Sequence, residues 1–125
     1  MDERAFAATV AERAGLTKQE ALDLIRATLE QLGGQLSSGE NRELGLVLPG
    51  GLASQLPQHD HGAHPVPLTD FIHRLAERTG LSRHDVTSGV RATLSALAQV
   101  PDSTPVRNAL SQLPAEYRQL ARATA

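Results

Sequence analysis

Apolar side chains recur every three or four residues along most of this chain, the spacing that places them on one face of an α-helix. Phe6, Val10 and Ala14 form the first such face. Gly15 comes directly after it and is the residue type best suited to the left-handed cap that ends many helices. The pattern therefore predicts a helix over residues 2–14.

Capping residues predict two further helices before residue 57. Thr17 and Glu20 have the spacing of a capping box, so a second helix begins there and runs until the glycine pair at 33–34 stops it. Ser37 also precedes a glutamate by three residues, which predicts a short third helix.

Prolines mark the start of the last predicted helices. Pro49 suits a first helical turn, where a backbone N–H is not needed. Gly50 and Gly51 follow it and disfavour a helix by about 1 kcal/mol each relative to alanine, so we expect this fourth helix to be frayed or remodelled. Later in the chain, the Thr-Pro pair at 104–105 has the N-cap and proline order of a helix start, and Pro114 opens the final helix.

The whole pattern returns once at an offset of 65 residues. Residues 6–17 read Phe-x3-Val-Ala-Glu-Arg-Ala-Gly-Leu-Thr, and residues 71–82 read Phe-x3-Leu-Ala-Glu-Arg-Thr-Gly-Leu-Ser. At the same offset and without a gap, Arg-Ala-Thr-Leu occurs at 26–29 and again at 91–94. Such a match at a fixed offset predicts an internal duplication.

These patterns predict an all-α protein, a compact helical bundle of two tandem, diverged four-helix repeats. The first repeat covers residues 1–57, a linker rich in His, Pro and Gly covers residues 58–67, and the second repeat covers residues 68–125. A unit of about 55 residues buries too little apolar surface to be secure alone, so we expect the repeats to share a core.

Composition narrows the possible functions. Cys is absent, which excludes disulfides, a thiolate nucleophile and cysteine-based metal sites. No catalytic elbow of the Gly-x-Ser-x-Gly kind, phosphate-binding loop or His-Glu-x-x-His motif occurs, so we expect neither an enzyme nor a cofactor. An acidic amino terminus and the lack of a long apolar run predict a cytoplasmic protein that does not enter a membrane.

The repeated residues also carry a family resemblance. The segment Phe-x3-Val/Leu-Ala-Glu-Arg-x-Gly-Leu-Thr/Ser, the Arg-Ala-Thr-Leu of the next helix and the Leu-Pro before the last helix resemble the bacterial domain-of-unknown-function family 2267. The resemblance covers nearly the whole chain outside the linker. It implies a compact helical bundle of tandem repeats and no particular chemistry. The glycine pair at 50–51 departs from the family pattern.

A helix-turn-helix is one candidate binding element. Residues 10–21 follow the pattern in which Ala packs, Gly turns and Thr caps a recognition helix, and the second repeat offers Arg83, His84 and Arg91 on the equivalent helix. Nucleic-acid binding is the alternative function that these residues suggest. The net charge of −2 opposes it, because attraction to phosphates dominates such affinity, so a glycine turn between two core helices is favoured.

The linker is a second candidate. His59, Asp60, His61 and His64 lie within six residues and offer nitrogen and oxygen ligands to a transition metal. Structural metal sites usually draw four ligands from ordered elements, so a solvated tether is the favoured interpretation.

Two polar sets complete the candidates. One set recurs in both repeats and consists of Glu12, Arg13, Arg26, Glu77, Arg78 and Arg91. These residues could flank a groove that binds a carboxylate or phosphate, join the first two helices by ion pairs, or face water. The structural interpretation is favoured, because exposed ion pairs are common. The other lies on the last helix, where Tyr117, Arg118 and Arg122 are residue types enriched at binding hot spots. We expect a protein-interaction or structural module, with a protein partner or self-association through this last helix.

Overall fold

The structure is a computed structural model and describes residues 2–57 and 64–122. The described residues form seven α-helices and one 3₁₀ helix, which confirms the all-α class. In chain order these are α1 (Glu3–Ala14), α2 (Lys18–Gly33), α3 (Ser38–Gly45), the 3₁₀ helix η1 (Leu52–Gln55), α4 (Leu68–Thr79), α5 (Arg83–Leu97), α6 (Thr104–Ser111) and α7 (Ala115–Arg122).

The predicted caps position the helix ends. Thr17 Oγ1 accepts the N–H of Glu20 at 3.1 Å, and Glu20 Oε1 accepts the N–H of Thr17 at 2.9 Å, which confirms the capping box. Gly15 and Gly80 adopt φ of 70° and 76°, so both predicted left-handed caps form. These caps fix where the chain turns from the first helix of each half into the second.

The two helices predicted to begin at Pro49 and at the Thr-Pro pair at 104–105 have different outcomes. The fourth helix of the first half is remodelled as expected: only η1 forms there, after Gly51 at φ 89°. A Cβ at Gly51 would lie 2.6 Å from Glu3 Oε2, so the glycine also makes room for that carboxylate. The start of α6 is a correction, because Ser103 is the N-cap and Thr104 is already the first helical residue.

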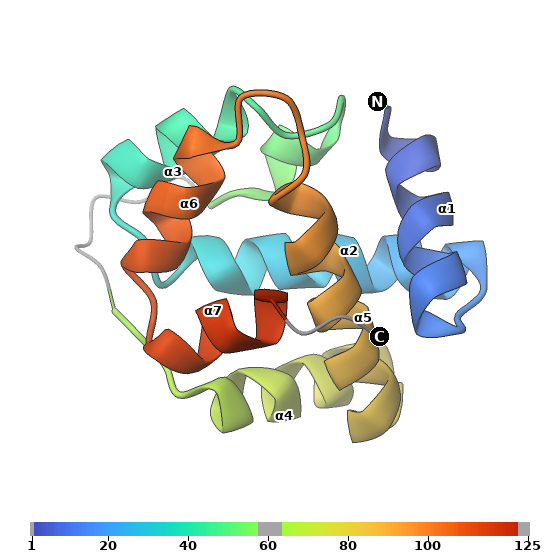
Figure 1. The fold of residues 1–125 in the computed structure, drawn as a ribbon. Helices are drawn as coiled ribbons and strands as arrows, with labels where there is room; N and C mark the ends of the chain where they lie inside the picture. The colour runs from blue at the N-terminus through green and yellow to red at the C-terminus, as the bar shows by residue number, and fades with distance from the viewer. Residues whose placement is uncertain (1, 58–63, 123–125) are drawn as a thin grey trace.

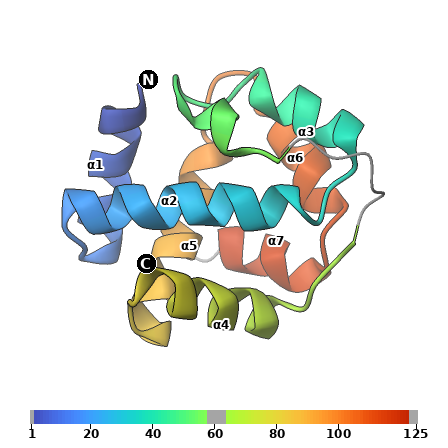
Figure 2. The same ribbon diagram turned by 180° about the vertical axis from the view of Figure 1, so that it is seen from behind.

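The two halves pack against each other around one core. Buried apolar residues of residues 2–57 and 64–122 form a single continuous cluster, so the expected shared core is confirmed. α1 packs against α5, and α4 packs against α2, so each half places its first helix on the second helix of the other half. Figure 1 shows α5 in front of α2, and Figure 2 shows the opposite side, with α2 in front.

Helix contacts correspond across the two halves. The packing of α1 with α2 matches that of α4 with α5, and η1 contacts α2 and α3 as α7 contacts α5 and α6. α2 and α5 meet where Cδ2 of Leu24 occupies the space that a Cβ at Gly89 would need, and Leu24 and Gly89 are 65 positions apart. The duplication itself stays a prediction, which these correspondences support.

Candidate binding site

A closed ring of hydrogen bonds joins the two halves beside the linker. Gln35 Nε2 donates to the hydroxyl of Tyr117 at 3.0 Å, and that hydroxyl donates to the carbonyl of Val66 at 2.6 Å. The N–H of Val66 donates to Gln35 Oε1 at 2.8 Å and closes the ring. Burial raises the pKa of Tyr117 to about 12, so the hydroxyl keeps its proton at neutral pH.

The ring corrects the role predicted for Tyr117. Partner contact required an exposed side chain, but Tyr117 has 0% exposure and packs edge-on against Phe71, with ring centroids 5.3 Å apart. Its hydroxyl is used inside the molecule, which is how a buried tyrosine usually satisfies its polar end. Tyr117 therefore belongs to the core and is hidden from a partner that docks on the folded surface.

The two arginines of α7 have different surroundings. Arg118 Nη1 donates to the carbonyls of Leu110 and Leu113, both at 2.9 Å, and thereby caps the carboxyl end of α6. Arg122 is exposed at the end of α7. Its role in partner contact stays a prediction.

A hollow of about 450 Å³ opens on the α2 side, directly above the ring, and most of its wall is apolar. We call it the linker hollow; it is lined by Glu30, Gln31, Gly34, Gln35, Pro57, His64, Val66 and Arg74. Gln35 is also held through its backbone, because its backbone carbonyl accepts the N–H of His64 at 3.1 Å. The wall is therefore fixed by hydrogen bonds among Gln35 just after α2, Tyr117 of α7 and the end of the linker.

An ion pair separates the linker hollow from a second hollow. Arg78 Nη2 lies 2.6 Å from Glu30 Oε2, which lowers the pKa of Glu30 and raises that of Arg78, since their hydrogen bond favours both charged forms. The second hollow, of about 320 Å³, is lined by Asp23, Arg26, Ala27, Gln55, Arg78 and Thr79. Both hollows thus follow the outward side of α2, which faces the viewer in Figure 2.

The repeated polar set joins helices, although with other partners than expected. Arg26 pairs with Glu3 at 2.6 Å and links α2 to α1, whereas Glu12 makes no ion pair among the described residues. Glu77 pairs with His73 on its own helix at 3.1 Å. Of the four repeated arginines, Arg26 and Arg78 join helices through carboxylates among the described residues, and their partners Glu3 and Glu30 lie outside the repeated motif.

The candidate nucleic-acid residues lie on α5, a helix that four other helices pack against. Arg83 and His84 are exposed at the start of α5, and Arg91 is partly buried further along. α5 is packed by α1, α2, α4 and α7, whereas a recognition helix must project far enough to enter a groove. This geometry gives the nucleic-acid prediction no support.

The predicted metal ligands fall mainly outside the described part of the chain. His59, Asp60 and His61 lie in residues 58–63, outside the described residues. His64 is described and lines the linker hollow. Within residues 2–57 and 64–122, no group of three or more His, Asp or Glu side chains is arranged to hold a metal ion.

Sequence analysis missed three residues of the site. Gln35, Val66 and Arg74 lie on separate segments and come together only in the folded chain. The one available signal was Gln35, a polar residue between the glycine pair that ends a helix and the buried Leu36. A polar residue in such a position requires a buried partner, but its partner cannot be named from local sequence.

The fold and these sites define an all-helical protein whose polar side chains join helices around one core. The chain belongs to the family described as "Uncharacterized conserved protein (DUF2267)", whose model matches residues 3–120. This confirms the resemblance recognised in the sequence. No curated protein matches the chain. Among the described helices, none is long and apolar enough to span a membrane.

Proposed function

We propose that this protein is a non-catalytic interaction module that binds an extended segment of a protein partner in the linker hollow. The observation that carries the proposal is the hollow itself, a mostly apolar space of about 450 Å³ on a rigid wall. An apolar cavity with a few fixed polar groups is the usual form of a recognition pocket.

The polar groups of the hollow favour recognition over chemistry. Glu30 is engaged by Arg78, and Gln35 is engaged by Tyr117 and Val66. Arg74 is exposed at the rim and makes no ion pair among the described residues. The hollow is therefore suited to an aliphatic side chain followed by a carboxylate, which Arg74 can bind in a forked geometry.

Glycine substitutions provide a matched test. Gly34 lines the hollow with φ −65°, and a Cβ there meets only backbone oxygens at 3.4 Å or more, so Gly34→Leu fills the space without strain. Gly39 lies on the exposed side of α3, where a Cβ meets nothing within 4 Å, so Gly39→Leu adds the same side chain elsewhere.

The experiment selects peptides from a random displayed library on the intact protein and measures affinities of the selected peptides by calorimetry. We expect peptides that combine an aliphatic and an acidic residue, with affinity reduced at least about tenfold by Gly34→Leu and unchanged by Gly39→Leu, since the first substitution removes one buried anchor. Selected peptides that bind Gly34→Leu as well as the original chain would contradict the proposal.

A further inference from the structure

Two arginines at corresponding positions differ in their partners. Arg26 donates to Glu3 Oε1 through Nε at 3.0 Å and through Nη2 at 2.6 Å. The position that corresponds to Glu3 in the second half is Leu68, which carries no charge. Arg91, the counterpart of Arg26, has its Nε shielded from solvent and without an acceptor among the described residues. The arginine is retained in the second half, but its carboxylate is not.

The other acids near Arg26 are also replaced in the second half. Asp23 lines the hollow of Arg26, and Glu30 binds Arg78 beside it. Their counterparts 65 residues later are Ser88 and Ser95. Neither serine can neutralise an arginine.

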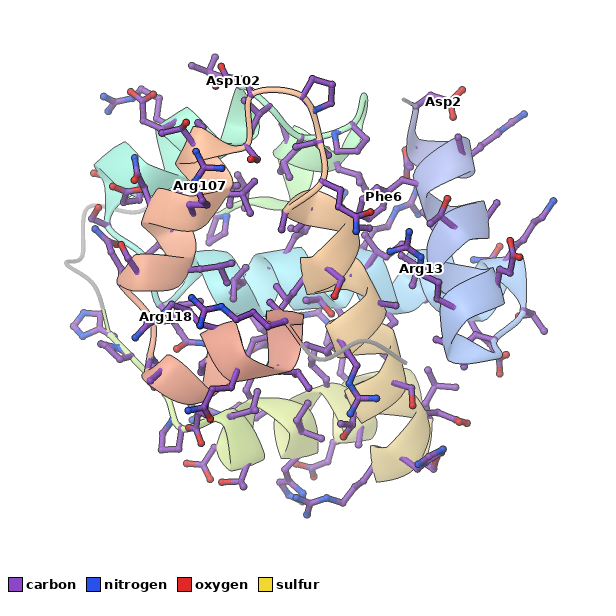
Figure 3. All side chains as sticks on the ribbon, viewed as in Figure 1. Asp2, Phe6, Arg13, Asp102, Arg107 and Arg118 are labelled. Carbon is purple, nitrogen blue, oxygen red and sulfur yellow. The ribbon has the colours of Figure 1, made fainter. Side chains whose placement is uncertain are left out.

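A second arginine lies on the same side as Arg91. This second arginine is Arg13 on α1, the counterpart of Arg78, which lies 65 positions later. Arg13 Nη2 donates to the neutral amide of Gln99 at 3.3 Å, just beyond the end of α5. Figure 3 shows Arg13 on the side of α1 that faces α5.

The matching helix contacts imply that Arg13 and Arg91 share one surface, as their counterparts Arg78 and Arg26 do. α1 packs on α5 as α4 packs on α2, and on the α2 side the corresponding Arg26 and Arg78 line one hollow. We call the equivalent surface the α5 face, defined by Arg13, Ser88, Arg91 and Ser95. It keeps both arginines and lacks the three carboxylates that accompany them on the α2 side, namely Glu3, Asp23 and Glu30.

We propose that the α5 face binds a carboxylate of an acidic segment in a protein partner. A guanidinium offers a planar fork of donors that matches a carboxylate, and partial burial strengthens such a bond by excluding water. Ser88 adds a hydroxyl one turn before Arg91, whereas the Ser95 hydroxyl is already engaged with the carbonyl of Ala121 at 2.7 Å.

The charge around the face favours an isolated carboxylate over a nucleic acid. Two arginines provide one anion position, and Asp85 in the first turn of α5 repels a continuous row of phosphates. The chain as a whole carries a net charge of −2. The proposal is independent of the linker hollow, which is lined by the end of α2. α2 and α5 lie on opposite sides of the bundle (Figures 1 and 2).

The test titrates the full chain with an acetylated oligoglutamate peptide by calorimetry at low ionic strength. Arg91→Gln and Arg13→Gln should each weaken binding about tenfold, because each removes a charge-assisted hydrogen bond. Ser88→Asp should weaken binding similarly, because it installs the acid that the first half has at Asp23. Circular dichroism checks that each variant is folded, and Arg13 is exposed, so its replacement leaves the core intact.

Matched controls separate this face from the rest of the molecule. Asp23→Ser changes the corresponding position on the α2 side, and Gly39→Leu adds a side chain on the exposed side of α3; both should leave oligoglutamate binding unchanged. Absence of binding to the original chain would overturn the proposal, as would binding by both arginine variants that is as tight as binding by the original chain. Tighter, arginine-dependent binding of a single-stranded oligonucleotide or of inorganic phosphate would also overturn it in favour of a phosphate site.

Discussion

The two sides of the bundle share a backbone plan and differ in charge. On the α2 side, Arg26 and Arg78 are neutralised by Glu3 and Glu30, so the arginines hold helices together. On the α5 side the corresponding arginines lack carboxylates. Since the helix contacts correspond, this difference is not required by the fold. Comparison of the sides therefore separates residues that build the structure from residues that are available to a ligand.

The largest expected change in stability concerns the point where α2 and α5 meet. Gly89→Leu would force a side chain into buried Leu24 and should destabilise the fold by about 3 kcal/mol, the cost of overpacking. Leu24→Gly should cost about 4 kcal/mol through a cavity and lost helix propensity. Urea unfolding followed by circular dichroism measures both changes.

The double variant exchanges the two residues between corresponding positions. If the Leu24 side chain fills the space left by Gly89, the double variant Leu24→Gly with Gly89→Leu should be destabilised less than the sum of the single variants. We expect a difference of at least about 1 kcal/mol in the free energy of unfolding. Strictly additive effects would show that the two positions do not share one packing site.

The second prediction concerns a feature that only one half possesses. Leu52 occupies the position that corresponds to Tyr117, so the hydrogen-bonded ring has no equivalent in the first half. Tyr117→Phe leaves the Gln35 side-chain N–H and the Val66 carbonyl without their buried partner and should cost about 2 kcal/mol in urea unfolding. Ser111→Ala removes a hydroxyl bond to a backbone carbonyl at an exposed position, and it should change stability by less than about 0.5 kcal/mol. Equal costs for the two variants would contradict a stabilising ring.

Local sequence predicted helix ends better than it predicted helix neighbours. The cap residues Thr17, Gly15 and Gly80 act within a few residues of their own position, so their roles follow from the sequence. The placement of α1 on α5 does not follow from the sequence. An apolar face indicates that another element covers the helix, but it does not identify that element.

The candidate site shows the same limit more strongly. Tyr117 was assigned to the surface because its residue type is common at interfaces, but its partners Gln35 and Val66 are distant in sequence. Arg91 is a nucleic-acid candidate in the sequence, but the reason for its interest here, the replacement of Glu3 by Leu68, required the contacts of Arg26 to be known. Residue pairing across the two halves therefore had to come from the structure.

The third prediction uses the titration of Tyr117, the only tyrosine in a chain without tryptophan. Burial raises its pKa in the folded state to about 12, above the value of about 10 in an unfolded chain. The protonated form is therefore favoured by folding. This contribution to stability is complete below about pH 10 and is lost as the pH rises to about 12. Ultraviolet absorbance of tyrosinate should show the folded chain ionising later than the chain in urea, and coincident titrations would contradict the buried ring.

The smallest predicted effects concern two glutamates, Glu3 and Glu116. Each glutamate contacts the residue that corresponds to the other one at the offset of 65 positions. In the first half Glu3 extends over Gly51, and in the second half Glu116 Oε1 accepts the N–H of Leu68 at 2.7 Å. Pro67 provides no side-chain cap for α4, so Glu116 serves as that cap, and Glu116→Ala should cost about 1 kcal/mol. Glu3→Ala removes a partly exposed ion pair and should cost less, about 0.5 kcal/mol, with a stronger dependence on salt.

Urea unfolding at low and high ionic strength distinguishes these two roles. A Glu116→Ala effect that disappears at high salt would identify Glu116 as a partner of a nearby cation instead of a cap. A persistent effect would mean that the Glu116 carboxylate is committed to the start of α4. Glu116 is the residue that corresponds to Gly51 of the first half. Because its carboxylate is bound to the start of α4, it does not neutralise Arg91, and the α5 face stays positively charged.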